Sequence, residues 1–224
     1  MPRRGVRCTV PAVIREVFRA VTHASAAIDR GVVRVMERRM AGSATRRTAA
    51  IPADAHRRLV ELAAAYRDDT LGAPSRFFPT PPRPRLTRAA VSPTVEHLTW
   101  TSGYRPFLPA YRDEHHRWVE NHTAHARRYT HAEARGPRPA LVLIHGWGGG
   151  AWWLEERAFA IGYWVARGFD VVAFQLPFHG ERAPGGVGRG PRSGALFPSA
   201  NVMRTNEAFG QAIWDLRGLA LALR

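Results

Sequence analysis

The chain has 224 residues, of which 45% are hydrophobic and 23% are charged, and these fractions exclude a globally disordered protein. A single cysteine, Cys8, excludes an intramolecular disulfide and a zinc site built from cysteines. We find no apolar run of about 18 residues, so we expect no transmembrane segment. Because Arg15 and Glu16 interrupt the stretch after the basic N-terminus, we expect no secretory signal and a cytoplasmic location.

The net charge of +15 is unevenly distributed, and all 33 basic residues are arginine. Residues 1–90 hold 18 arginines and 7 acidic residues, whereas residues 91–224 hold 15 and 11. Such a balance favours an anionic partner. However, a chain without lysine that is rich in alanine, glycine and proline is typical of a GC-rich coding bias. Aromatic residues also do not alternate with arginine in residues 1–70, so we expect no nucleic-acid partner.

The N-terminal part shows two amphipathic helix patterns followed by a proline-dense stretch. Apolar residues recur at spacings of three and four over 11–40 and over about 53–68. We expect a helical cap or extension over 1–72, with a membrane-surface helix as the alternative. Prolines in 73–93 disfavour a helix or central strand and predict a linker. The remaining residues, 94–224, form the predicted main domain.

Within the main domain, strands are expected first, and strand and helix then alternate. Two strands are predicted over 94–101 and 116–129, with a long turn between them. The later elements are a buried strand at 141–144, a helix at 152–167 closed by Gly168, a strand at 170–174, a glycine-rich loop at 183–199 and a helix from Asn206 onward. The last helix has a predicted apolar stripe of Phe209, Ile213, Leu216, Ala220 and Leu223. This order predicts an α/β fold with about four strands, a parallel pair among them, and flanking helices.

The most informative stretch is the glycine cluster that follows the strand at 141–144. His145 and Gly146 begin the cluster, which continues to Gly150. Backbone amides in such a turn, next to a helix N-terminus, can bind a pyrophosphate or stabilise an oxyanion. The segment matches the dinucleotide pattern G-x-G-x-x-A. That function also needs an acid at the end of the next strand, where Gln175 stands.

The same loop, together with Leu176–Arg182 after the next strand, resembles the α/β-hydrolase superfamily in its esterase-like branch. Gln175 replaces the acid that usually opens the second motif. The resemblance covers residues 94–224 and implies the N-terminal part of an α/β-hydrolase domain, with an incomplete sheet. It further implies a serine hydrolase of ester or similar acyl bonds that takes a small-molecule substrate and needs no cofactor.

The resemblance also implies roles for individual residues. The backbone N–H of Trp147 is the expected oxyanion donor, while His145, Gly146 and Gly148 shape the loop. His179 and Gly180 are expected at the rim of the pocket.

No catalytic residue can be identified, because none of the serines stands in G-x-S-x-G. We therefore expect this chain to stop before the nucleophile, acid and histidine of the family and to be inactive by itself. The strand at 141–144 would then have an open edge, which predicts self-association or poor solubility.

Two further functions stay open, and one kind of site is not favoured. A non-enzymatic α/β module could bind a partner or an anionic surface through the arginine-rich helices, with affinity that falls steeply with salt. A dinucleotide-binding protein is the second alternative. Histidines cluster between residues 115 and 131 on an expected turn and strand, and the sequence favours exposed histidines over a metal site there.

Overall fold

A computed structural model describes residues 53–66, 73–133, 135–186 and 192–224, together with His23, Arg30, Gly31 and Arg34. Contacts divide the chain into two compact units, Met1–Arg58 and Leu59–Arg224. The helix expected over 11–40 lies outside the described residues except for the four isolated ones, which are helical. The division into a cap, a linker and a main domain stays a prediction.

The described chain contains α-helices, short 3-10 helices (η) and strands. In chain order they are α2 (Ala53–Ala65), α4 (Pro74–Phe77), β1 (Thr87–Ser92), β2 (Val95–Thr101), η1 (Pro109–Tyr111), α5 (Arg112–Arg117), η2 (Val119–His122), β3 (Thr123–Tyr129), β4 (Ala140–Ile144), α6 (Trp152–Ala158), α7 (Ile161–Ala166), β5 (Asp170–Phe174), η3 (Gly180–Arg182) and α8 (Val202–Leu223). None of these helices is long and apolar enough to span a membrane.

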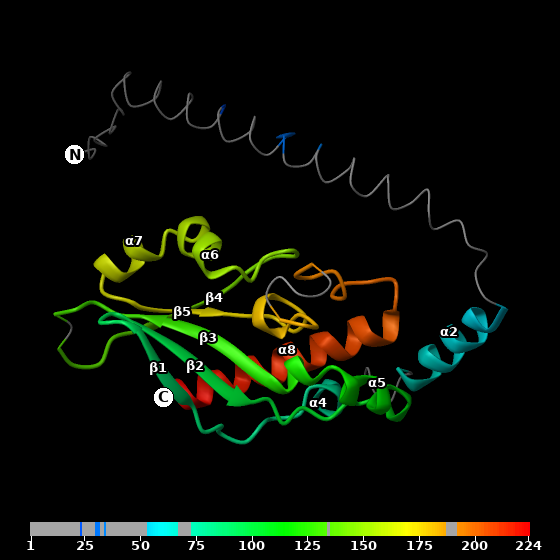
Figure 1. The fold of residues 1–224 in the computed structure, drawn as a ribbon. Helices are drawn as coiled ribbons and strands as arrows, with labels where there is room; N and C mark the ends of the chain where they lie inside the picture. The colour runs from blue at the N-terminus through cyan, green and yellow to red at the C-terminus, as the bar shows by residue number, and fades with distance from the viewer. Residues whose placement is uncertain are drawn as a thin grey trace, which may run out of the picture. The chain divides into compact units, whose positions relative to one another are not determined.

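The strands form one mixed sheet in the order β1-β2-β3-β5-β4 (Figure 1). Antiparallel pairing joins β1 to β2, β2 to β3 and β3 to β5, whereas β4 and β5 are parallel. The predicted α/β fold with a parallel pair is confirmed, with five strands in place of about four. The additional strand, β1, lies in the stretch expected to be a linker. Its residues are all exposed, so its pairing with β2 depends on backbone hydrogen bonds that a side-chain pattern does not reveal.

Helices cover both faces of this sheet, with α8 on one face and α6 and α7 on the other (Figure 1). Strand β5 is buried along its whole length because its side chains pack against the helical layers on both faces of the sheet. Val172 and Phe174 pack with Leu219 of α8, while Val171 and Ala173 pack on the opposite face. This explains why β5 is a continuous apolar run, as expected for a strand between two helical layers.

The strand expected over 116–129 begins only at Thr123. The chain before it folds into η1, α5 and η2, so the first half of that prediction is wrong. Pro109 occupies the first turn of η1, Asp113 lies in the first turn of α5, and Arg117 lies in its last turn. Each placement favours a helix, because proline fits a helix start and the charges match the helix dipole.

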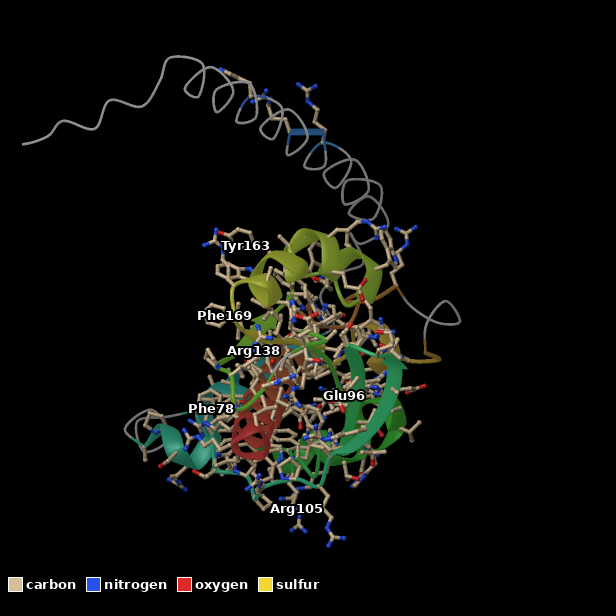
Figure 2. All side chains as sticks on the ribbon, turned by 90° about the vertical axis from the view of Figure 1, so that its left-hand side faces the viewer. Phe78, Glu96, Arg105, Arg138, Tyr163 and Phe169 are labelled. Atoms are coloured by element: carbon tan, nitrogen blue, oxygen red, sulfur yellow. The ribbon has the colours of Figure 1, made fainter. Side chains whose placement is uncertain are left out.

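The helix expected over 152–167 is divided into α6 and α7. Ala160, between them, has a left-handed backbone with φ of 48°, which breaks the run of helical hydrogen bonds. Gly168 closes α7 as expected, with φ of 98°. Arg138, labelled in Figure 2, donates hydrogen bonds to the carbonyls of Val165 and Gly168 at 2.7 and 2.9 Å and so satisfies the end of this helix.

The final helix, α8, starts at Val202, four residues before the expected position. The side chain of Asn201 accepts a hydrogen bond from the backbone N–H of Arg204 and caps the helix. The predicted apolar stripe holds in part, since Leu216 and Leu223 pack against the core whereas Phe209 is 50% exposed. The fully buried positions of α8 are Leu219 together with polar and small residues, namely Glu207, Ala208, Gly210, Gln211, Ala212, Asp215 and Gly218.

Helix α2 confirms the helix expected over about 53–68, although it ends at Ala65. Leu59 on its expected stripe is exposed, and Leu62 and Tyr66 are half-buried. The aromatic ring of Tyr66 stacks on Phe107 at 5.8 Å and meets Phe77 edge-on. Only part of the predicted stripe is therefore buried.

Candidate functional site

The two glycine-containing loops of the sequence analysis lie next to each other in the structure. One follows β4 and the other follows β5, and these two strands are parallel neighbours, so both loops leave the same edge of the sheet. In open α/β sheets, ligands bind at this carboxyl edge. A hydrogen bond from the Gln175 side chain to the carbonyl of Gly150 connects the two loops directly.

His145 fixes the start of the first loop. Its side chain is buried, and its Nδ1–H donates to the carbonyl of Gly146 at 2.9 Å. Its Nε2 accepts the backbone N–H of Leu176 at 3.1 Å, which ties the loop after β4 to the loop after β5. Burial lowers the pKa of His145, so the ring stays neutral and keeps Nε2 available as an acceptor.

The middle of this loop is open to solvent. Gly146, Trp147 and Gly148 are exposed, and the indole N–H of Trp147 donates to the carbonyl of Gly194 at 2.8 Å. The backbone N–H groups of Trp147 and Gly148 make no hydrogen bond to any residue that the structure describes. By contrast, Gly149 N–H donates to the carbonyl of Gly146 at 3.1 Å. Two unused amide donors are thus held on a constrained turn.

Gln175, at the position of the family's acid, holds the second loop together. Its side chain is fully buried, and its Nε2 donates to the carbonyl of Gly150 at 2.7 Å and to a Glu181 carboxylate oxygen. Its Oε1 accepts the backbone N–H of Glu181 at 3.1 Å. The other Glu181 carboxylate oxygen accepts the indole N–H of Trp152 at 2.6 Å, so α6 is tied to the same loop.

His179 is buried inside the loop assembly and Gly180 is half-buried beside it, while their place at the rim of a pocket stays a prediction. The His179 side chain is 1% exposed, and its Nδ1–H donates to the carbonyl of Pro177 at 2.8 Å. Burial lowers the pKa of His179 to about 4, and Nε2 has no hydrogen-bond partner in the described part of the chain. Gly180 has φ of 52°, and a Cβ there would lie 1.8 Å from Nε2 of Gln175, so this position requires glycine.

Ser193 approaches the loops but is not arranged as a nucleophile. Its hydroxyl accepts the backbone N–H of Gly180 at 2.9 Å and donates to the carbonyl of Gly149. Neither bond leads to a histidine or a carboxylate, which a serine nucleophile needs as a base. Within the described ranges, this serine joins three loops, and we identify no catalytic residue.

Dinucleotide binding is not favoured by this geometry. A carboxylate oxygen of Glu155 accepts the N–H of Gly150 at 2.8 Å, and the Glu155 side chain is buried. The chain's own negative charge therefore occupies the place that a pyrophosphate would need. Gln175 cannot hold a ribose hydroxyl either, because its amide is buried and fully engaged.

A buried polar cluster beneath the loops was not identified from the sequence. Arg182 and Asp215 are fully buried and form an ion pair at 2.8 Å, which joins the loop after β5 to α8. Arg182 also donates to the carbonyls of Gln175 and Asn121 at 3.2 and 3.1 Å. The hydroxyl of Ser102 donates to the second Asp215 oxygen at 2.7 Å. Burial raises the pKa of Asp215, and the Arg182 guanidinium acts against that shift.

The cluster has a recognisable signal in the sequence, though a weak one. Arg182 ends the second motif, and Asp215 interrupts the apolar pattern of α8 with a residue type that is buried only when paired. Nothing in the local pattern connects two residues so far apart along the chain. Their pairing follows from the packing of α8 against the sheet.

Comparisons with known proteins give relatives without an assigned function. No family model matches the chain. An uncharacterized protein of Mycobacterium tuberculosis strain CDC 1551 / Oshkosh and one of strain ATCC 25618 / H37Rv are each 34% identical over 167 residues. The match covers 69% of this chain and 37% of each relative, so the chain spans well under half the length of these relatives.

Among solved structures, acetyl xylan esterase 1 from Thermoanaerobacterium sp. JW/SL YS485 is similar over 68% of this chain and 44% of that chain. The sequence identity is 20% and the TM-score is 0.37, which is too low for this likeness to assign a shared family.

Proposed function

We propose that this chain supplies the oxyanion-binding part of a serine hydrolase that acts on esters or similar acyl bonds. The observation that carries the proposal is the pair of backbone amides at Trp147 and Gly148 that have no hydrogen-bond partner among the described residues, on a loop that His145 and Gln175 hold in place. Donors held in place before the reaction stabilise a developing negative charge without reorganisation. Their position at the carboxyl edge of β4 and β5 is also where ligands bind in such sheets.

The attacking group is expected outside the described residues. Ser193 bonds to no histidine or carboxylate, the Asp215 carboxylate that accepts the buried Ser102 hydroxyl is paired with Arg182, and no serine of the sequence stands in G-x-S-x-G. The position of β4 agrees with this reading. It pairs with β5 on one side and is the last strand of the described sheet, whereas the family places a further strand next to it. By itself the chain should therefore bind a tetrahedral anion and leave esters intact.

An amide titration tests the binding half of the proposal. A ¹⁵N-labelled chain would be titrated with methylphosphonate, a tetrahedral anion, and with acetate at matched ionic strength. We expect the Trp147 and Gly148 resonances to shift saturably and more with methylphosphonate, while the exposed turn glycine Gly136 stays unchanged. Equal shifts at all three amides would reduce the effect to general anion screening and refute the proposal. Saturable shifts with a nicotinamide dinucleotide, and none with methylphosphonate, would support the alternative function.

Two measurements test the second part of the proposal, that the nucleophile lies outside these residues: an ester assay and the coding sequence past residue 224. With p-nitrophenyl acetate, this chain should release p-nitrophenol at the rate of buffer alone. A burst equivalent to the chain concentration would reveal a nucleophile within it and contradict the proposal. In the coding sequence past residue 224, a G-x-S-x-G within about fifteen residues is expected from the strand and helix lengths of the family. Its absence from every reading frame would also count against the proposal.

A further inference from the structure

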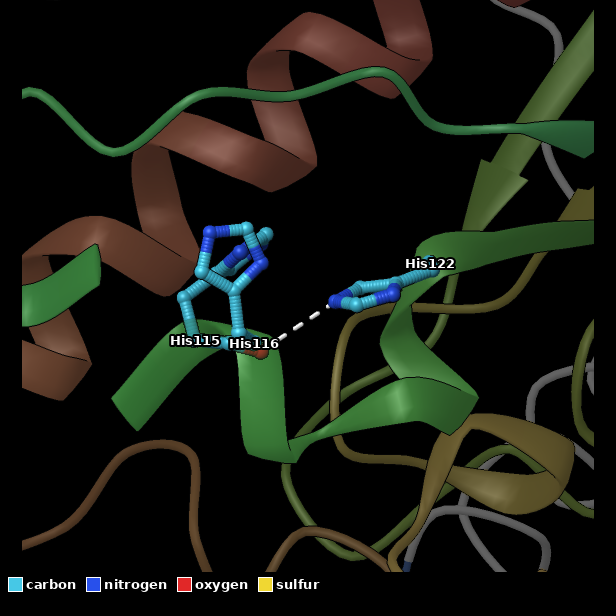
Figure 3. Close-up of side chains that lie close together, drawn as sticks. All are labelled: His115, His116 and His122. Carbon is cyan, nitrogen blue, oxygen red and sulfur yellow. Dashed lines mark hydrogen bonds between the residues drawn. The ribbon is translucent and has the colours of Figure 1, made fainter. Parts of the chain in front are cut away.

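Three histidines meet at the turn that leads into β3 (Figure 3). His115 and His116 lie on α5, and His122 is the last residue of η2. The chain returns on itself between them, so the ring of His122 faces the other two. One ring nitrogen from each of the three lies within 4.8 Å of the others.

These separations are close to those of a metal centre. Zinc binds imidazole nitrogens at 2.0–2.1 Å, so three nitrogens on a tetrahedral ion are roughly 3.3 Å apart. His116 is exposed and free to rotate toward the other two rings. The centroid of the His115 ring is 5.1 Å from that of His122 and 6.0 Å from that of His116. Rotation of the exposed His116 side chain shortens its distances to the other two rings, and closing the distance between His115 and His122 requires a shift of the half-buried His122 ring.

The burial of His115 supplies an independent indication of a ligand. Its side chain is 7% exposed, and neither ring nitrogen has a hydrogen-bond partner among the residues that the structure describes. The aromatic rings of Tyr104 and Tyr111 are its neighbours at 6.0 and 6.3 Å. A buried polar group without a partner is costly, and an absent ion is one of its ordinary explanations.

His122 is oriented by a hydrogen bond to the same helix. Its Nε2–H donates to the carbonyl of His115 at 3.2 Å, because a carbonyl only accepts. The ring nitrogen that faces His115 and His116 is this Nε2 (Figure 3). A metal ion therefore takes Nε2 in exchange for this long bond, and the proton of the neutral ring moves to Nδ1.

We propose that His115, His116 and His122 bind one divalent transition-metal ion, zinc, with water in the remaining position. Imidazole ligands select zinc, copper, nickel or iron over the oxygen-seeking magnesium and calcium. The sequence did not favour this site because it placed residues 116–129 on a strand, where His116 and His122 share a face, His125 points the other way and no third histidine converges with the pair. The helical turns at α5 and η2 instead bring all three rings to one side of the turn.

The test uses the full chain without a polyhistidine tag, stripped of metal by a chelator. Isothermal titration with zinc should give one equivalent of binding, and cobalt should give the visible absorption bands of a tetrahedral site. His116→Ala should weaken zinc binding at least about tenfold, since loss even of an outer hydrogen-bond partner costs that much at zinc sites. His131→Ala, at an exposed histidine outside the cluster, should leave the affinity unchanged.

Two controls keep the outcome decisive. Since His116 is exposed, its variant should fold, and an unchanged far-UV circular dichroism spectrum would verify this. One equivalent of zinc should also raise the unfolding temperature of the natural chain and not that of His116→Ala, because a ligand that binds only the native state stabilises it. No saturable zinc binding would overturn the proposal, and so would equal loss of affinity in His116→Ala and His131→Ala.

Discussion

The buried pair of Arg182 and Asp215 gives the sharpest stability prediction. Asp215→Asn keeps the shape of the side chain and removes its charge. The guanidinium of Arg182, fully buried, would then keep its hydrogen bonds to the carbonyls of Asn121 and Gln175 and lose its counter-ion. Removing one partner of a buried pair costs about 3–5 kcal/mol, because an uncompensated charge is left inside the protein.

This cost is large compared with the total stability of a domain, which is about 5–15 kcal/mol. For a chain of this size it corresponds to a fall in the unfolding temperature of about 10 °C. Urea unfolding followed by far-UV circular dichroism would measure it, with linear extrapolation and a check that the denaturant slope is unchanged. An unchanged slope shows that the variant lost stability and not two-state behaviour.

Two further variants separate the charge effect from general damage. Arg88→Ala removes one member of the exposed pair with Glu96, whose side chains are 45% and 34% exposed, and should cost under about 1 kcal/mol. The double variant R182M/D215L removes both buried charges and should be less destabilised than Asp215→Asn. If Asp215→Asn costs no more than Arg88→Ala, or if the double variant is the least stable, the reasoning is refuted.

Three other predictions concern the loops and the sheet edge. Gly180→Ala should destabilise the chain by more than about 1 kcal/mol in urea unfolding, because φ is positive and the added Cβ would clash with the Gln175 side chain. Gly162→Ala in α7, where the added Cβ meets open space, should change stability by less than that, and equal effects of the two variants would contradict the strain argument. Burial lowers the pKa of His179 to about 4, so the unfolded state binds its proton more tightly, and this residue should reduce stability by up to about 3 kcal/mol as pH drops from about 6.5 to about 4. His179→Gln should make the pH profile less steep but not flat, because burial also lowers the pKa of His115 and His125 to about 4; an unchanged slope would contradict the assignment. Ile144→Lys places a charge on the edge strand β4, where Ile144 is 47% exposed, and should reduce self-association of the chain as measured by sedimentation. If the natural chain is monomeric at all concentrations, self-association through this edge is refuted.

Much of the fold is encoded locally and could be read from the sequence. The apolar runs of β4 and β5 identify two parallel strands, and Gly168 marks the end of a helix by its freedom to adopt a positive φ. Burial on both faces was predicted correctly for β5 and wrongly for β4, which is the edge strand and is only half-buried at its centre. The glycines after β4 mark a turn where the backbone approaches its surroundings closely. These features depend on a few consecutive residues, so the pattern alone was sufficient.

The sequence predicted the two loops at one edge of the sheet, whereas their role as a functional site stays a prediction. The loop from His145 to Gly148 does lie at the carboxyl edge of the sheet, next to the loop that contains His179. The sequence did not reveal that His179 is buried or that Gln175 joins the two loops. Side-chain identity gives the possible hydrogen bonds of a residue, whereas its partners depend on how the two loops pack.

What the tertiary structure alone decided is which residues far apart along the chain become partners. The pattern of α8 predicted Phe209 on its buried face, and packing instead turned Asp215 inward to meet Arg182. The three histidines of the proposed metal site face each other only because the chain folds back before β3. Local sequence determines what each segment can form, but a buried charge or a converging set of ligands is defined by long-range packing, which no single stretch of residues contains.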